Sequence, residues 1–198
     1  MGVREEQRVR TRAHLLSVAH RLFADRGYAD VGLAEVVATA GVTKGALYHH
    51  FDGKLELFRA VAAAVARQVG EQVAARADAE PDAWDGLLAG CEEFLRAATA
   101  PAARRVLLLE APAVLGWEQW HGLDEVNSVA HLRPALAHLL PDAPLEPLVR
   151  TVSGALNESA RWIATLVGAE RDRALAECAE VVRRLLTGYR ASSGRSVS

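Results

Sequence analysis

The chain of 198 residues has only two cysteines and lacks any long apolar run. Cys91 and Cys178 lie far apart and form no CxxC pair, which predicts two reduced, buried thiols. No segment approaches the ~20 apolar residues that cross a bilayer, and residues 1–6 contain no apolar signal-peptide core. We therefore expect a soluble, cytoplasmic protein with no membrane partner.

The sequence also lacks the short motifs of several common enzyme classes. It contains no phosphate-binding loop and no GxGxxG, HExxH or GxSxG sequence. Glu118 and His121 have the spacing of half a carboxylate-bridged di-iron site, but the second Glu-x-x-His is missing. His49 and His50 are adjacent, and adjacent residues on a helix point about 100° apart, which does not suit one metal ion. We expect no enzymatic activity, no cofactor and no metal site.

Sustained alternation of β-branched residues is absent too, whereas apolar residues make up 51% of the chain. They recur at steps of three and four, which predicts an all-α fold. Gly27 is expected to end a first helix, and a second short helix is expected at about 33–39. Thr43 is a suitable cap for a third helix, and a fourth, long helix is expected to start at Asp52 or Gly53.

Prolines and one aspartate divide the rest of the chain. Asp82 is expected to open a helix after a break at residues 79–82. A second break is expected at residues 111–113, and Arg133-Pro134 is the expected joint in a helical stretch from Trp117 to Leu140. Two long helices are expected to close the chain, at about 145–168 and 171–189.

The formal net charge of −2 does not indicate a nucleic-acid-binding protein. The distribution of charge is more informative. Residues 1–59 carry nine Lys and Arg against seven Asp and Glu, together with four of the seven histidines. This modest bias favours DNA contact at the N-terminal end.

The most informative segment runs from Ala40 to Phe51, with the sequence AGVTKGALYHHF, and is followed by Lys54. It reads as the end of one short helix, a glycine turn and a second short helix. This is the layout of a helix-turn-helix motif, whose second helix enters the DNA major groove. The order Ala-Gly-Val, Thr-Lys-Gly, Leu-Tyr-His-His-Phe and a Lys three residues on resembles the TetR family of bacterial transcriptional regulators.

The residue types of this segment suit DNA contact. Thr43 lies where free N–H groups at a helix start favour a phosphate, and Lys44 adds a positive charge. Gly45 and Ala46 are small enough for close approach to the groove. The resemblance implies phosphate contacts and positions near bases, and it assigns them to Thr43, Lys44, Gly45, Tyr48, His49, His50 and Lys54.

One departure from the family pattern concerns the cap of the second helix. Gly32 stands where the family usually has Thr or Ser, so a side-chain acceptor and a phosphate contact are missing. Arg8, Arg10 and Arg12 form an N-terminal basic cluster. Two interpretations of this cluster are open: it compensates at the DNA backbone or minor groove, or it is a solvated arm.

The resemblance implies three segments: a DNA-binding domain at 1–52, a ligand-binding and dimerisation domain at 53–191, and a frayed tail at 192–198. It also implies a homodimer that binds a pseudo-palindromic operator in double-stranded DNA, because one recognition helix covers half a site. The last two helices are the expected dimer interface. The alternative is that their apolar residues form an ordinary intrachain core.

The predicted pocket for a small-molecule effector is assigned to aromatic residues and to polar residues near apolar helices. They are Trp84, Phe94, Glu110, Trp117, Trp120, His121, Asn157 and Arg161. Each of them, taken alone, also fits a core or surface role.

The sequence therefore predicts a DNA-binding transcriptional regulator, in particular a repressor that an unidentified effector releases from its operator. Two alternatives remain. One is an activator, or a regulator controlled by a protein partner. The other is a helical ligand-binding module that has lost DNA recognition, against which Tyr48 and Lys54 speak.

Overall fold

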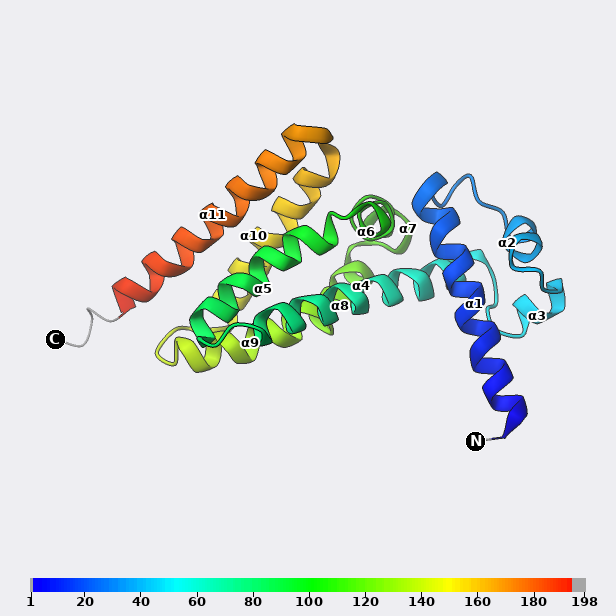
Figure 1. Cartoon of the computed structure of the whole chain (residues 1–198), viewed down its shortest axis with the longest axis horizontal. Coiled ribbons are helices and arrows are strands. Elements are labelled where there is room, and N and C mark those ends of the chain that lie inside the picture. Colours follow the sequence, from blue (N-terminus) through cyan, green and yellow to red (C-terminus); the bar gives the residue numbers. More distant parts are fainter. Residues whose placement is uncertain (1, 194–198) are drawn as a thin grey trace. The chain divides into compact units, whose positions relative to one another are not determined.

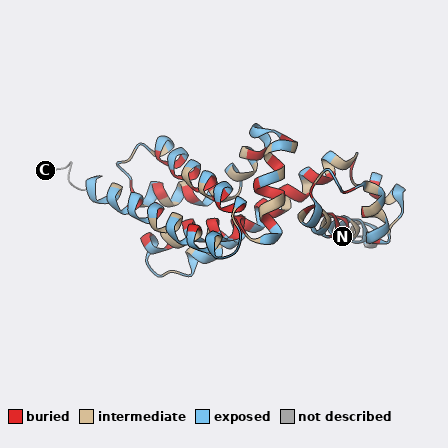
Figure 2. Cartoon of the chain, turned by 90° about the horizontal axis from the view of Figure 1, so that it is seen from above, coloured by how far each residue is buried: buried red, intermediate tan, exposed pale blue. Residues whose placement is uncertain are grey.

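The computed structural model describes residues 2–193, and within this range it consists of helices and connecting loops without strands (Figure 1). This confirms the predicted all-α fold. Figure 2 shows buried and exposed residues alternating along the helices, as amphipathic helices require. In the described part of the chain, no helix combines the length and the apolar character that a membrane crossing needs.

The chain forms two compact units. The first extends from the N-terminus to Val65 and includes residues 101–120, and the second comprises residues 66–100 and the chain from His121 onward. The long helix α4 (Lys54–Asp78) and the helix α8 (Trp117–Glu125) each belong partly to both units. Compactness divides α4 after Val65, because its first turns pack with the N-terminal helices, and the expected functional boundary at residue 52 stays a prediction.

The first unit is built on α1, the first 12 residues of α4 and the short helices around them. Apart from α4, its elements are α1 (Val3–Arg26), α2 (Leu33–Ala40), α3 (Lys44–Tyr48), α6 (Pro101–Arg104), the π-helix η1 (Arg105–Glu110), α7 (Ala111–Leu115) and the start of α8. Phe23 and Phe58 meet edge to face in its core, with ring centroids 5.2 Å apart. Such burial of large aromatic rings fixes α4 against α1.

Gly27 ends α1, as predicted, and its backbone N–H donates to the carbonyl of Phe23. Its φ of 87° lies in the region that only glycine adopts without strain. A Cβ at this position would also collide with the carboxylate of Glu110 at the end of η1. That carboxylate ends a flexible side chain that can move aside, so the positive φ is the stronger reason for a glycine at this position.

The break expected at residues 111–113 is not present. The structure has the helix α7 there, and it begins at Ala111. Pro112 lies just after the π-helix η1, and the backbone of Glu110 and Ala111 is helical, so the proline lies where the helix changes from π- to α-type and causes no break.

The second unit contains the end of α4, the helix α5 (Ala83–Ala98), the end of α8, α9 (Ser128–Leu139), α10 (Leu145–Thr165) and α11 (Gly168–Ser193). The helix α5 contacts α9, α10 and α11. Asp82 caps α5 as predicted, because its carboxylate accepts from the backbone N–H groups of Trp84 and Asp85 at 2.8 and 3.0 Å.

The joint expected at Arg133-Pro134 lies elsewhere. The chain breaks at residues 126–127, between α8 and α9, and Pro134 is inside α9. The side chain of Asn127 donates to the carbonyl of Leu123 at 2.6 Å and so satisfies a carbonyl at the end of α8. Local side-chain bonding by asparagine outweighs the proline as a helix terminator here.

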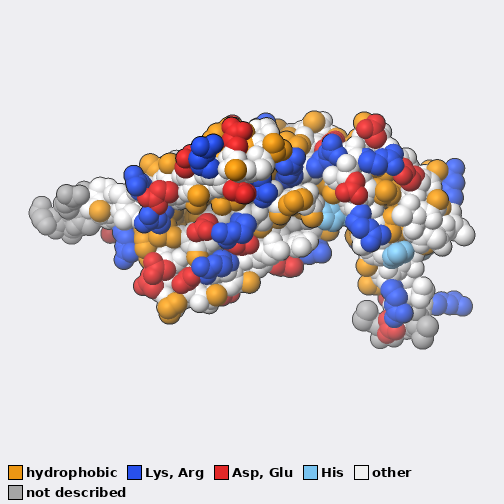
Figure 3. Space-filling model, turned by 45° about the horizontal axis from the view of Figure 1, so that its top comes forward, with side chains coloured by type: hydrophobic (Ala, Val, Ile, Leu, Met, Phe, Trp, Pro, Cys, Tyr) orange, Lys and Arg blue, Asp and Glu red, His pale blue; other side chains and the backbone are white. Residues whose placement is uncertain are grey.

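The helix α11 continues to Ser193, and Ser192 donates to the carbonyl of Gly188 at 3.0 Å. Most of the tail that was expected to fray, residues 194–198, lies outside the described residues. The surface seen in Figure 3 shows acidic and basic side chains interspersed with hydrophobic ones over the second unit. This agrees with the nearly neutral formal charge of the chain.

Candidate nucleic-acid interface and ligand cavity

The turn between α2 and α3 is closed by backbone hydrogen bonds. Gly41 adopts a left-handed conformation (φ 64°, ψ 28°), and its N–H donates to the carbonyl of Ala38 at 3.2 Å. The N–H of Val42 donates to the carbonyl of Val37 at 3.2 Å. These bonds satisfy the last carbonyls of α2, and they give the tight connection that a helix-turn-helix motif needs.

Thr43 caps α3, as predicted. Its backbone is extended, and its hydroxyl oxygen accepts from the N–H of Ala46 at 3.1 Å. Because the hydroxyl oxygen acts as the acceptor, the hydroxyl hydrogen can still be donated to an external group. At the start of a helix, a phosphate oxygen is a suitable acceptor for that hydrogen.

The residues of α3 and its C-terminal flank fall into two sets. Leu47 and Phe51 are 0% and 1% exposed and belong to the core. Lys44, Tyr48 and His49 are exposed, and Tyr48 keeps 45% of its surface accessible. The ammonium group of Lys44 lies 5.8 Å from the centroid of the Tyr48 ring, so a positive charge and an aromatic hydroxyl share one face.

Lys54 at the start of α4 is already held in place within the first unit. Its ammonium group donates to the carbonyl of Ala29 at 3.2 Å and lies 4.3 Å from the centroid of the Tyr28 ring. Neither contact neutralises the positive charge. A lysine that is ordered in this way loses less side-chain entropy on binding a phosphate.

A groove separates the first turns of α1 from α3. It is lined by Arg4, Glu5, Gln7, Arg8, Thr11, Thr43, Gly45, Ala46, His49 and His50. Seven of the eight predicted DNA contacts are therefore either in this groove or on the exposed face of α3 beside it, and the eighth, Lys54, lies at the start of α4.

Two arginines of the N-terminal basic cluster have partners. Arg8 forms an exposed ion pair with Glu5 at 2.8 Å, and the guanidinium group of Arg12 lies 5.1 Å from the centroid of the Phe51 ring. Burial lowers the pKa of His50, and the positive charges of His49, Arg8 and Arg12 lower it further. An added negative group at this place would oppose that effect.

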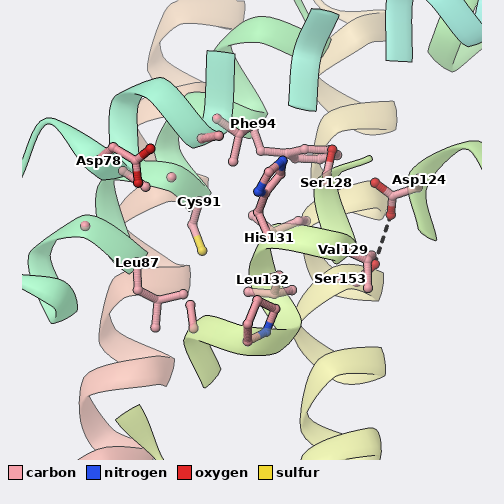
Figure 4. A pocket seen from close by; sticks show the side chains of 18 of the residues that line it. Asp78, Leu87, Cys91, Phe94, Asp124, Ser128, Val129, His131, Leu132 and Ser153 are labelled. Atoms are coloured by element: carbon pink, nitrogen blue, oxygen red, sulfur yellow. Dashed lines mark hydrogen bonds between the residues drawn. The ribbon is translucent and has the colours of Figure 1, made fainter. Parts of the chain in front are cut away.

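The second unit contains a cavity of about 420 Å³ between the end of α4 and the helices α5, α9 and α10 (Figure 4). Most of its wall is apolar, and it includes Val73, Leu87, Phe94, Val129, Leu132 and Leu156. A volume of this size falls within the usual range of small-molecule sites. Cys91 also lines it, and burial raises the pKa of this thiol to about 12, so the thiol stays protonated near neutral pH.

Polar groups gather at one side of the cavity. Asp124 at the end of α8 accepts hydrogen bonds on Oδ2 from Ser153 Oγ (3.1 Å) and Asn157 Nδ2 (2.7 Å), both on α10. Burial raises the pKa of Asp124, and hydrogen bonds with Asn157, Ser153 and Ser128, together with the charge of His121, oppose the rise. In Figure 4, His131 projects from α9 into the pocket beside Phe94 and Ser128.

The eight predicted ligand contacts lie in different parts of the structure. Phe94 lines the cavity, and Asn157 donates a hydrogen bond to Asp124, which lines it. Trp84 is buried under the guanidinium group of Arg190, at 4.5 Å, and Arg161 is exposed with Glu158 at 3.7 Å.

The remaining four are distributed over both units. His121 lies in the second unit and is partly buried. Glu110, Trp117 and Trp120 belong to the first unit. Trp120 donates to the carbonyl of Leu107 at 2.7 Å, whereas Trp117 is 62% exposed. Of the eight predicted ligand contacts, Phe94 lines the cavity and the other seven do not.

Sequence reasoning missed Asp124, the most deeply buried acid of the cavity wall. A signal for it was present in α10, where Ser153 and Asn157 are polar residues one turn apart on an otherwise apolar face. Such a pair predicts a buried polar partner on a neighbouring helix. The sequence does not reveal which residue that partner is.

The closed glycine turn, the capped short helix and its exposed polar face define a helix-turn-helix DNA-binding protein. Comparison with known families agrees. A model described as "Bacterial regulatory proteins, tetR family" matches residues 15–61. A second one, described as "Tetracyclin repressor-like, C-terminal domain", matches residues 84–189, more than half of the chain. The chain belongs to the TetR family and is a transcriptional regulator with a helix-turn-helix DNA-binding domain.

Relatives support this assignment over different lengths. A TetR-family transcriptional regulator from Pectobacterium atrosepticum has a solved structure that is 31% identical, with a TM-score of 0.78 over 92% of this chain and 95% of that one. The regulator AcrR of Shigella flexneri is 43% identical over 61 residues, which is 31% of this chain and 28% of AcrR. The transcriptional activator FasR of Mycolicibacterium smegmatis is 50% identical over 50 residues, 25% of this chain and 23% of FasR. The chain thus matches less than a third of the length of these two curated relatives.

Proposed function

We propose that the protein is a repressor that binds a pseudo-palindromic operator as a homodimer and leaves it when a small molecule occupies the cavity. The observation that supports the proposal is that α3 and the residues after it have one buried and one exposed set of side chains. Leu47 and Phe51 fix the helix in the core, so its exposed residues are free to contact DNA. In this proposal Thr43, Tyr48, His50 and Lys54 bind phosphates, Lys44 serves both phosphates and bases, and Gly45, Ala46 and His49 lie near bases.

The proposed dimer forms through α10 and α11. On α11, Val182 and Leu186 are buried within the chain, whereas their neighbours Val181 and Leu185 are 56% and 62% exposed. Trp162 on α10 is exposed as well. One face of α11 thus packs on its own subunit while an adjacent apolar strip remains for a second copy, as a symmetric interface requires.

The proposed release mechanism uses α4. This helix is continuous from Lys54, a proposed phosphate contact, to Asp78 in the cavity wall. A ligand that binds one conformation of the cavity more tightly shifts the protein toward that conformation. Ligand and operator then weaken each other's binding by the same factor.

Activation of transcription is a second candidate, since FasR, which matches the N-terminal part of the chain, is an activator. Both candidates require operator binding, and they differ in the effect on transcription. A reporter gene placed behind the operator distinguishes them, because a repressor lowers expression and an activator raises it.

Selection from a random duplex library at near-physiological salt tests the proposal. The wild type is expected to enrich a pseudo-palindrome with half-sites about one helical turn apart. A Tyr48→Ala/Lys54→Ala variant is expected to enrich nothing, and Arg67→Ala, which removes an exposed positive charge on α4 in the second unit, is the matched control that keeps enrichment.

Equal, weak and salt-sensitive binding by wild type and variant would contradict the proposal. The motif would then serve the fold alone, and the helical ligand-binding module would be the better interpretation.

A further inference from the structure

The charged groups in the cavity wall are acidic. Among the described residues that line it, Asp78 and Asp124 carry carboxylates, His131 carries an imidazole, and no Lys or Arg is present. Figure 4 shows Asp78 and Asp124 on opposite sides of the pocket. A bound molecule therefore lies between two negative groups.

The carboxylate of Asp124 has neutral hydrogen-bond donors in place of a strong cation. Ser153 and Asn157 both donate to its Oδ2 atom, and no Lys or Arg of the described chain forms an ion pair with it. His121 contributes electrostatic attraction. Hydrogen bonds from neutral groups offset only part of the cost of removing a carboxylate from water. A cationic group placed against Asp124 recovers more of that cost.

The rest of the wall sets the other property of the ligand. Leu87 and Phe94 of α5 and Leu132 of α9 present apolar surface. Burying apolar surface contributes roughly 25 cal/mol per Å². The molecule that fits best is therefore one with an apolar body and a single charged end.

We propose that the cavity selects an apolar cation, with its ammonium or amidinium group against Asp124 and its apolar body along α5. This inference rests on the proposed role of the cavity as the effector site. A carboxylate ligand has one partner, His131, and two repelling acids. A neutral hydroxyl ligand can donate to Asp124 but brings no positive charge to it.

The test compares matched probes that differ in one group, titrated by calorimetry into the full chain at pH 7.5. One set is 1-naphthylmethylammonium, 1-naphthylmethanol and 1-naphthoate, and the other is decylammonium, decanol and decanoate. We expect the cation of at least one set to bind about tenfold more tightly than its alcohol, the difference made by one charge pair, and the carboxylate to bind most weakly.

Three variants locate the effect. Asp124→Asn is expected to reduce the preference for the cation over the alcohol to less than about threefold. Asp78→Asn is expected to reduce it less, because Asp78 is exposed and its charge is screened by solvent. Asp172→Asn changes an exposed acid of α11 outside the cavity and is expected to leave the preference for the cation unchanged. Circular dichroism confirms folding of each variant.

Alcohols that bind as tightly as their cations in both sets overturn the inference while the cavity remains a ligand site. So does a preference for the cation that persists in folded Asp124→Asn. Absence of binding by all six probes overturns the inference and the effector role together, and operator selection then shows separately whether DNA binding stands. The wild-type comparison needs no variant, so it decides the question even if Asp124→Asn does not fold.

Discussion

The two sites of this protein are built in opposite ways. The proposed DNA-contacting surface comes mainly from residues 43–50, whose side chains are largely exposed around a short helix held by two core residues. The cavity takes its wall from residues 73–156, on five helices, and the polar residues Ser153 and Asn157 beside Asp124 are buried. The first site depends on local geometry and the second on how helices far apart in the sequence pack. Substitutions that affect one site and spare the other test this difference.

The largest effect is expected where the DNA surface depends on the core. Leu47→Ala removes a fully buried side chain and is expected to lower the free energy of unfolding by about 2–5 kcal/mol. Because Leu47 holds α3, operator binding should be lost as well. Urea unfolding followed by circular dichroism measures the first effect, and a gel-shift assay measures the second.

Leu55→Ala is the control for that prediction, because Leu55 is an exposed leucine at the start of α4. A change of more than about 1 kcal/mol in this control, or little change in Leu47→Ala, would contradict the assigned burial.

A smaller effect is expected where the cavity depends on helix packing. A Cβ at Gly86 would lie 2.9 Å from the carbonyl oxygen of Ala77, a backbone atom that cannot move alone. Gly86→Ala is expected to separate α5 from α4, to cost about 1–3 kcal/mol of stability and to weaken ligand binding. Thermal unfolding and titration with the tighter-binding ammonium probe measure both, while operator binding should persist under folding conditions.

Gly90→Ala is the matched control one turn further along α5. Its Cβ would lie 3.5 Å from the Cβ of Ala77, an ordinary contact. The alanine also raises helix propensity, so we expect stability equal to or above that of the wild type. Equal losses in both variants would show that the close approach at Gly86 is not the limiting contact.

The smallest effect concerns pH at the DNA surface. In the free protein, burial and neighbouring positive charges lower the pKa of His50. A phosphate at this position favours the protonated form, so the pKa rises again in the complex and binding takes up a proton. Operator affinity should therefore be highest below the pKa of the free protein and should fall as pH rises through the pKa of the complex, by less than about tenfold.

His50→Gln removes the titrating group but keeps a hydrogen-bond donor. Fluorescence anisotropy between pH 5.5 and 8 should show a flatter profile for this variant than for the wild type. Identical profiles would place His50 away from the phosphates.

The parts of the structure that could be predicted from the sequence are those that local chemistry determines. The cap at Thr43, the cap at Asp82 and the glycine ends at Gly27 and Gly41 each depend on a few neighbouring residues, and each is present. Gly32 caps α2 without a side-chain hydrogen bond, as a glycine must, and the loss of a phosphate contact at this position stays a prediction.

The parts that could not be predicted depend on packing between distant segments. Proline at 112 and 134 suggested breaks, but its effect depends on its position within a helix, which the surrounding core decides. Nothing in the local sequence distinguishes Asp124 from a surface aspartate, because its partners Ser153 and Asn157 lie on α10 and reach it only in the folded chain. Three predicted pocket residues, Glu110, Trp117 and Trp120, fall in the other compact unit because residues 101–120 pack with the N-terminal helices.

The division within α3 also has an evolutionary consequence. Leu47 and Phe51 carry the stability of this region, whereas Lys44, Gly45 and Tyr48 contribute little buried surface. After gene duplication, a copy could therefore acquire new residues at these exposed positions, and a new operator, without a loss of stability that selection would have to repair. The same freedom makes α3 a practical place to redirect such a regulator to a chosen promoter.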